Sequence, residues 1–185
     1  MGYGADASYS DEGELARAWP RFWARIFDTF LYAIAAGIVL GLLFPSLFYA
    51  EIFQGRLGAV LIGMMILPFA MIIDAIIISK FGTSLGKAIA GLRVADLESS
   101  KLSLETSLKR NLLVYVKGLG LGIPLVNLAA YARSHADVTS EGMTSWDKDT
   151  SSRVFAGSNN DLRTWAIALL AIAAMVIDRA LGLMA

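Results

Sequence analysis

Two acids inside apolar stretches are the residues of this chain best placed to do chemistry. Asp28 lies in the apolar run 26–44, and Asp74 lies in the run 57–79. An acid at the centre of a bilayer costs at least about 2.5 kcal/mol on insertion scales, so it needs a partner or a task. Arg25 stands three positions before Asp28, which places both side chains on one face of a helix. The pattern predicts a buried group of two carboxylates and one guanidinium.

The charge count of that group indicates two kinds of role. One arginine neutralises one carboxylate, so the second carboxylate is left to bind a proton or a monovalent cation. Asp28 and Asp74 would then form an ion site with Arg25 as its counter-charge. The alternative is structural: Arg25 and Asp28 lock the fold, and Asp74 reaches the membrane interface or bonds to a hydroxyl such as that of Thr29.

The composition places these acids in a membrane protein. Of the 185 residues, 56% are hydrophobic and 17% are charged, whereas a soluble domain carries about 25% charged residues. Lys+Arg and Asp+Glu number 16 each, so no net positive field indicates a nucleic-acid partner. Cysteine is absent and histidine occurs once, which excludes disulfides and thiolate clusters. We expect no metal and no other cofactor.

The apolar runs predict an all-α membrane protein, built as a small helical bundle in the lipid bilayer. The runs 26–44 and 57–79 approach the ~20 residues that cross ~30 Å of hydrocarbon, and 165–185 is a third transmembrane candidate. The stretch 111–131 is also long enough, but it contains three glycines at alternate positions followed by a proline. Such a sequence is a poor helix interior. The stretch is either a full but broken span or a re-entrant segment with both ends on one side.

Lysine and arginine gather on one predicted side of the membrane. They are concentrated before the first span and in the segments 80–110 and 133–163. By the positive-inside rule these parts face the cytoplasm, which predicts a multi-pass protein of the cell membrane with a cytoplasmic N-terminus. The same rule favours the re-entrant alternative. We also expect a short β-hairpin or interfacial helix on the cytoplasmic face near 91–105, and we find no internal repeat in the sequence.

A glycine-rich stretch follows the second span. Gly82-Thr-Ser-Leu-Gly-Lys87 is one residue shorter than a nucleotide-binding loop, and Ala88 replaces the metal-binding hydroxyl, which argues against nucleotide binding. We expect the small residues to allow a sharp exit from the span. Lys87 and Arg93 are expected to contact anionic lipid headgroups.

Four segments, in this order along the chain, carry a family resemblance. They cover residues 22–28, 82–96, 108–111 and 146–154. Together they resemble the RDD family of small integral membrane proteins, which is named for one arginine and two aspartates.

The resemblance assigns the named residues and divides the chain. It implies that the arginine is Arg25 and that the aspartates are Asp28 and Asp147. Three parts then follow one another: a mobile polar tail at 1–16, an RDD-like membrane domain at 17–155, and a linker with an additional C-terminal transmembrane helix at 156–185.

Two functions compete at this point. The first is transport, as cation/proton exchange (antiport), which the resemblance supports because a few family members are proposed to be sodium/proton antiporters. Asp147 would then gate the site or form a structural pair with Arg25, and so small a chain would need a homo-oligomer. The second is a membrane scaffold or assembly partner that transports nothing. We do not expect an enzyme, because no nucleophile–base pair or cofactor fingerprint is visible.

Overall fold

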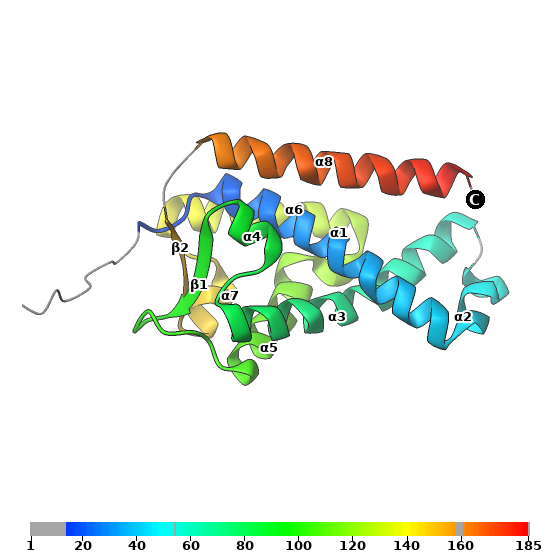
Figure 1. The fold of residues 1–185 in the computed structure, drawn as a ribbon, viewed down its shortest axis with the longest axis horizontal. Coiled ribbons are helices and arrows are strands. Elements are labelled where there is room, and N and C mark those ends of the chain that lie inside the picture. The colour runs from blue at the N-terminus through cyan, green and yellow to red at the C-terminus, as the bar shows by residue number, and fades with distance from the viewer. Residues whose placement is uncertain (1–13, 54, 158–160, 185) are drawn as a thin grey trace, which may run out of the picture.

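Two long antiparallel helices form the centre of the molecule. The computed structural model describes residues 14–53, 55–157 and 161–184, without the side chains of residues 47, 48, 53, 56, 124 and 178–184. The helices are α1 (Ala18–Leu43) and α3 (Gly55–Phe81), with the short α2 (Pro45–Tyr49) and η1 (Glu51–Phe53) between them in the chain (Figure 1). In the described part of the chain, α1 and the Leu57–Phe81 part of α3 are long and apolar enough to cross a membrane. These two helices correspond to the first two predicted spans.

Prolines mark where the helices begin and end. Pro20 lies in the first turn of α1, where a missing N–H leaves no bond unmade. Pro45 begins α2, and the preceding Phe44 has left the helical conformation at φ −136° and ψ 61°. A proline disfavours the α conformation at the residue before it, which explains why α1 ends there.

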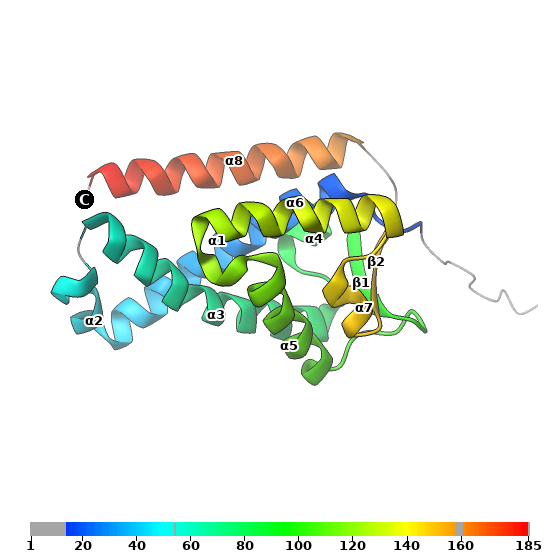
Figure 2. The same ribbon diagram turned by 180° about the vertical axis from the view of Figure 1, so that it is seen from behind.

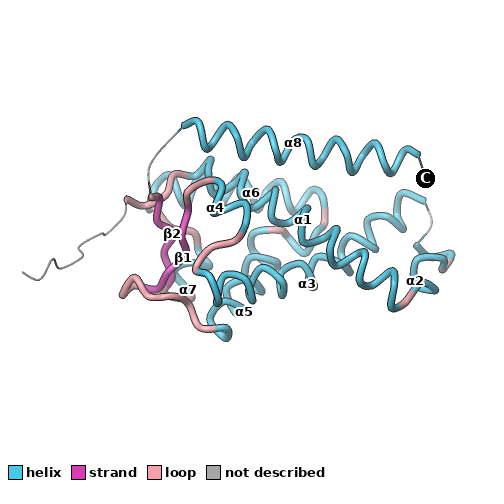
Figure 3. Tube along the Cα trace, in the orientation of Figure 1, coloured by secondary structure: helices cyan, strands magenta, loops and turns pink. Residues whose placement is uncertain are grey.

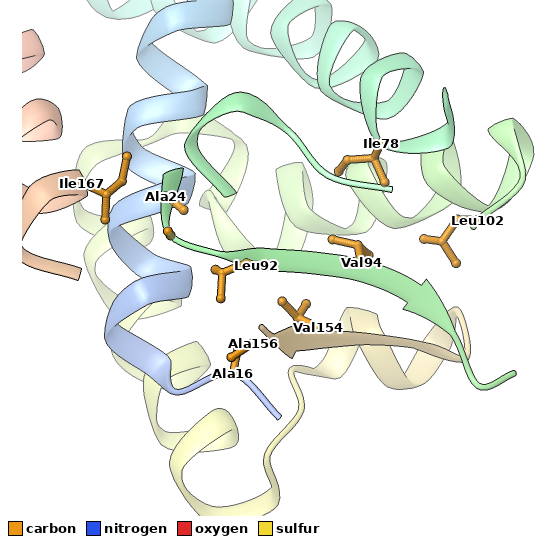
Figure 4. Close-up of a cluster of buried hydrophobic side chains, with 10 residues drawn as sticks. Ala16, Ala24, Ile78, Leu92, Val94, Leu102, Val154, Ala156 and Ile167 are labelled. Carbon is orange, nitrogen blue, oxygen red and sulfur yellow. The ribbon is translucent and has the colours of Figure 1, made fainter. Parts of the chain in front are cut away.

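A two-stranded antiparallel sheet lies at the opposite end of the molecule from α2 (Figures 1 and 3). Its strands are β1 (Leu92–Asp96) and β2 (Ser152–Ala156), with Val94 opposite Val154. The sheet packs on the central helices through one apolar cluster (Figure 4). Its fully buried members are Ala16, Ala24, Ile78, Ala90, Leu92, Val94, Leu102, Val154, Ala156 and Ile167.

The predicted local hairpin near 91–105 is wrong, because β1 pairs with a strand sixty residues further along the chain. The Asp96 carboxylate turns the chain away from such a hairpin. Its oxygens accept hydrogen bonds from the backbone N–H groups of Glu98 and Ser100 and from the Ser100 hydroxyl. Ser103 then caps the next helix by accepting a hydrogen bond from the N–H of Thr106.

Of the predicted mobile tail at 1–16, residues 1–13 lie outside the described residues. The backbone of residues 14–16 pairs with β2. The N–H of Ala16 donates to the carbonyl of Val154 at 3.0 Å, and the N–H of Ala156 donates to the carbonyl of Glu14 at 2.8 Å.

The stretch 111–131 is a broken helical hairpin and not one continuous helix. α5 (Leu104–Leu113) continues into a π-helical turn, η2 (Val114–Gly118), and then into the 3-10 turn η3 (Gly120–Gly122). α6 (Pro124–Glu141) then runs back toward the strands, as Figure 2 shows. The chain thus turns back within this stretch, and its re-entry into the membrane from one side stays a prediction.

Glycines make this hairpin turn. Gly120 and Gly122 have φ values of 53° and 81°, which L side chains rarely adopt. A Cβ on Gly122 would lie 2.8 Å from Cδ1 of Leu67, so the turn needs a glycine to sit this close to α3.

The last helix, α8 (Asp161–Met184), begins beside the N-terminal part of α1 and separates from α1 toward its own C-terminal end (Figures 1 and 2). Ile167, Ala168 and Ala171 are buried, whereas Leu169 and Val176 are more than half exposed. Its exposed apolar face is typical of a helix in contact with lipid, but a third transmembrane span stays a prediction.

The expectation that the chain has no internal repeat is wrong at the level of structure. α3 is followed by the short helix α4 (Leu85–Ile89) and then β1, and α6 is followed by α7 (Ser145–Asp149) and then β2. Adding sixty to the residue numbers of α4 and β1 gives the residue numbers of α7 and β2. Gly82 and Gly142 have φ values of 71° and 72°, and Ser84 and Thr144 stand at the N-caps of the short helices.

The strand register makes this repeat two-fold. Leu92 pairs with Ala156, and Asp96 pairs with Ser152. A shift of sixty residues converts the first pair into the second, so the pairing is self-complementary in the way that a two-fold axis requires. The axis passes between Val94 and Val154. The fold thus contains two similar units joined through one sheet, and we call these units, each with the helices that precede it, the two halves.

Candidate functional site

The ammonium of Lys87 lies between the two predicted acids. Its Nζ is 3.1 Å from Oδ2 of Asp28 and 3.4 Å from Oδ1 of Asp74, and it donates to Oγ of Ser84 at 2.7 Å. The Lys87 side chain is 7% exposed. We call this group, together with Asn111, the Lys87 cluster. The structure therefore brings Asp28 and Asp74 together, with a lysine as their shared counter-charge.

Both carboxylates have further donors. The N–H of Gly86 donates to Oδ1 of Asp28 at 2.7 Å, and the Ser84 hydroxyl donates to Oδ2 of Asp28. The Asn111 amide donates to Oδ2 of Asp74 and to the carbonyl of Met71, both at 2.9 Å. The Lys87 cluster thus ties α1, α3, α4 and α5 to one another.

Gly86 allows α4 to approach α1 this closely. A Cβ at this position would lie 2.7 Å from the carbonyl oxygen of Ala24 and 2.9 Å from Oδ1 of Asp28. Those separations are shorter than any real Cβ contact, so a larger residue would push α4 away and break the bond from the Gly86 N–H. The glycine-rich stretch that resembles a phosphate loop therefore binds the carboxylate of Asp28.

The predicted headgroup role of Lys87 is corrected by its burial. Its ammonium is taken up by two carboxylates and a hydroxyl inside the protein. Arg93 is exposed and donates to the carbonyl of Ser99. Contact of Arg93 with anionic headgroups stays a prediction.

A second buried charge cluster surrounds Asp147, which is 1% exposed. Nε and Nη2 of Arg110 lie 3.0 and 2.7 Å from Oδ1 of Asp147, and Nη1 of Arg21 lies 3.5 Å from Oδ2. Burial by itself raises the pKa of the Asp147 carboxyl. The charges of Arg110 and Arg21 outweigh it, so the net pKa lies below the usual value.

Arg25 does not make the ion pairs that we predicted from the sequence. We expected it to be the counter-charge of Asp28 and Asp74 and the partner of Asp147. Its guanidinium instead lies over the ring of Trp146, with Cζ 5.1 Å from the ring centroid. This is a cation–π contact. The ion pairs of these three acids within the described residues are made by Lys87, Arg21 and Arg110.

The two clusters occupy equivalent places in the two halves. Lys87 is the third residue of α4, and Asp147 is the third residue of α7. Each meets a charge of opposite sign on the first helix of its half, Asp28 on α1 and Arg110 on α5. At this one position the second half carries the charge opposite to that of the first half.

A cavity of about 50 Å³ lies beside the Asp147 cluster. Its walls come from both halves of the molecule and include Lys87. The polar side chains that line it belong to Arg21, Arg25, Lys87, Arg110, Tyr131, Ser134, His135, Thr144, Trp146 and Asp147.

These features define a helical membrane-type protein whose apolar helices enclose paired charge clusters. The chain belongs to the RDD family, whose model matches residues 15–184. The match extends past the predicted boundary at 155 and includes α8. No curated protein and no solved structure is detectably similar to this chain.

Proposed function

We propose that this RDD family protein exchanges a monovalent cation for a proton at the Lys87 cluster. The observation that supports this most is the surroundings of the Lys87 ammonium, which three oxygens from Asp28, Asp74 and Ser84 contact. Carboxylate and hydroxyl oxygens are also the ligands that hard metal cations prefer. A monovalent cation has the same charge as the ammonium and can take its place.

The exchange balances in charge. Lys87 releases one proton from its ammonium to water and becomes a neutral amine. One monovalent cation then binds between the carboxylates of Asp28 and Asp74. Two carboxylates and one positive charge are present before and after, so the buried site carries one net negative charge in both states. The reverse step takes up a proton and releases the cation.

The proposal includes an orientation in the cell membrane. α1, α3 and α8 cross the bilayer, and the α5–α6 hairpin enters and leaves on one side. The N-terminus and the sheet face the cytoplasm, because lysine and arginine concentrate in the segments at that end. A homo-oligomer supplies the second surface that alternating access needs. No step of this function is enzymatic.

Flux into sealed vesicles tests the proposal. Purified protein is placed in liposomes that hold a pH-sensitive dye, and a Na⁺ or K⁺ gradient is applied. In vesicles with the wild-type protein, protons should move in the direction opposite to the cation flow. Asp74→Asn, which keeps the shape of the side chain, should abolish this proton movement. Asp161→Asn is the matched control, because the Asp161 side chain is 84% exposed. Equal flux in Asp74→Asn and wild type, with both proteins folded, would overturn the proposal.

A second function, a non-transporting scaffold, is favoured by the completeness of the hydrogen bonds. Each oxygen of Asp28 and Asp74 already has a donor within the protein. A cluster with complete hydrogen bonds can hold four helices together without binding any ion. This alternative predicts no flux under any gradient, together with a large loss of stability in Asp28→Asn.

A further inference from the structure

The cavity beside Asp147 has an excess of positive charge. Three arginines line it, namely Arg21, Arg25 and Arg110, and Asp147 is the one acid in its described lining. Arg21 and Arg110 share that single carboxylate, and Arg25 is held by the face of Trp146. Taken with the adjoining Lys87 cluster, the four cations Arg21, Arg25, Lys87 and Arg110 outnumber the three described carboxylates of Asp28, Asp74 and Asp147 by one. Charges with no counter-ion are costly to bury.

Three residues that line the cavity also have donor groups without acceptors. Within the described residues, Nη1 of Arg110, Nε of Arg21 and Nε1 of Trp146 are buried without a hydrogen-bond partner. Arg110 is 1% exposed and Trp146 is 4% exposed. A buried donor is nearly always paired in a native protein, so each of these atoms indicates an acceptor that the chain does not supply.

We propose that this cavity binds a phosphate group. A tetrahedral oxyanion offers acceptors in several directions, and its negative charge offsets the excess positive charge. Guanidinium and indole N–H groups are suitable donors for such an anion. One water needs about 10–15 Å³ of such space, so a cavity of about 50 Å³ admits a group of a few heavy atoms.

The nearby carboxylate does not oppose this assignment. Oδ1 of Asp147 accepts from Arg110, and Oδ2 accepts from Arg21, so the acid is fully engaged with the arginines that it orients. The equivalent position of the other half holds Lys87 among oxygens. The second half is thus suited to an anion, as the first half is suited to a cation. This inference does not depend on cation exchange at Asp28.

The phosphate group has two sources, free phosphate and a lipid headgroup, and the experiment separates them. Inorganic phosphate is titrated into the full-length protein in an uncharged detergent and followed by calorimetry, with chloride added to match the ionic strength. In parallel, thermal unfolding is measured in phosphatidylcholine nanodiscs with and without phosphatidic acid. Binding in the first arm indicates free phosphate. Stabilisation in the second arm alone indicates a lipid phosphate.

Two variants leave the Asp147 ion pairs intact. Arg25→Gln removes one positive charge, and Trp146→Phe removes one donor and keeps most of the ring. Each should weaken phosphate binding, or the stabilisation by phosphatidic acid, by about tenfold for a lost charge and less for the lost indole donor. Arg17→Gln is the control, because the Arg17 side chain is 62% exposed. The proposal is overturned if neither arm shows binding, or if both cavity variants bind as the control does.

Discussion

Lys87 and Asp147 stand at the same position of two structural repeats, sixty residues apart, and carry opposite charges. Each is buried, and each is paired with a charge on the first helix of its own half. A buried ion pair holds its partners in one arrangement, because removing either member leaves an uncompensated charge. The two ion pairs therefore fix how α4 packs on α1 and how α7 packs on α5.

Lys87→Met should destabilise the folded protein strongly. It leaves Asp28 and Asp74 buried without a counter-charge, a change that costs about 3–5 kcal/mol in buried ion pairs. Unfolding by denaturant in detergent measures the loss, and the double variant Lys87→Met with Asp28→Asn should recover part of it. Lys101→Met is the control, because Lys101 bonds only at the surface. A loss no larger than that of the control would contradict the assigned pairing.

Gly86→Ala should lower the stability by about 1–3 kcal/mol, as expected for overpacking. The added Cβ would meet the carbonyl oxygen of Ala24 at 2.7 Å. Gly63→Ala is the matched control, because its Cβ would have no neighbour within 4 Å. Alanine favours a helix more than glycine does, so the control should gain stability slightly. Thermal unfolding of both variants checks the difference, and equal midpoints would refute the close approach of α4 to α1.

The stability should fall at acid pH because of Asp147. The pKa of this carboxyl is lower in the folded protein than in the unfolded chain. Its contribution is therefore complete above the ordinary value of about 3.9 and is lost as the pH falls through the folded-state pKa. Unfolding midpoints between about pH 3 and pH 7 measure this, and Asp147→Asn should flatten the acid limb. An unchanged acid limb in Asp147→Asn would show that other groups cause it.

A disulfide should form between cysteines placed at Arg93 and Phe155. These residues lie directly opposite each other in the antiparallel pair of strands, and directly opposite residues have Cβ atoms about 4.5–5.5 Å apart. The chain contains no cysteine of its own, so the two introduced cysteines have no other cysteine in the chain to pair with. Mobility on a non-reducing gel detects the cross-link, with each single-cysteine variant as control. Failure of the pair to cross-link under oxidation would count against the long-range sheet.

The long helices and the burial of the two acids could be predicted because both depend on local hydrophobicity. The apolar run 57–79 lies within α3, and the run 26–44 lies within α1 except for Phe44. Asp28 and Asp74 are 3% and 6% exposed. A run of apolar residues defines a span without knowledge of any partner. The same reasoning could not find the counter-charge. Lys87 looks like a loop residue, and it becomes buried only because Gly86 lets α4 fold back onto α1.

The repeat and the sheet escaped prediction for a different reason. The units around β1 and β2 share few identical residues, chiefly Gly82 with Gly142, Arg93 with Arg153 and Val94 with Val154. The backbone conformation is kept while the buried charge at Lys87 and Asp147 is reversed, so similarity of side chains gives little signal. A glycine followed by a serine or threonine cap at both places is the pattern that could have revealed it.

The ammonium of Lys87 contacts the acids, and Lys87 is also one of the residues that line the arginine-rich cavity. A negative ion lodged in that cavity would stabilise the protonated lysine, and a metal cation seated between the acids would displace it. Thermodynamic reciprocity then requires each ligand to alter the affinity of the other by the same factor. The two proposals together thus assign Lys87 a shared role at both binding sites.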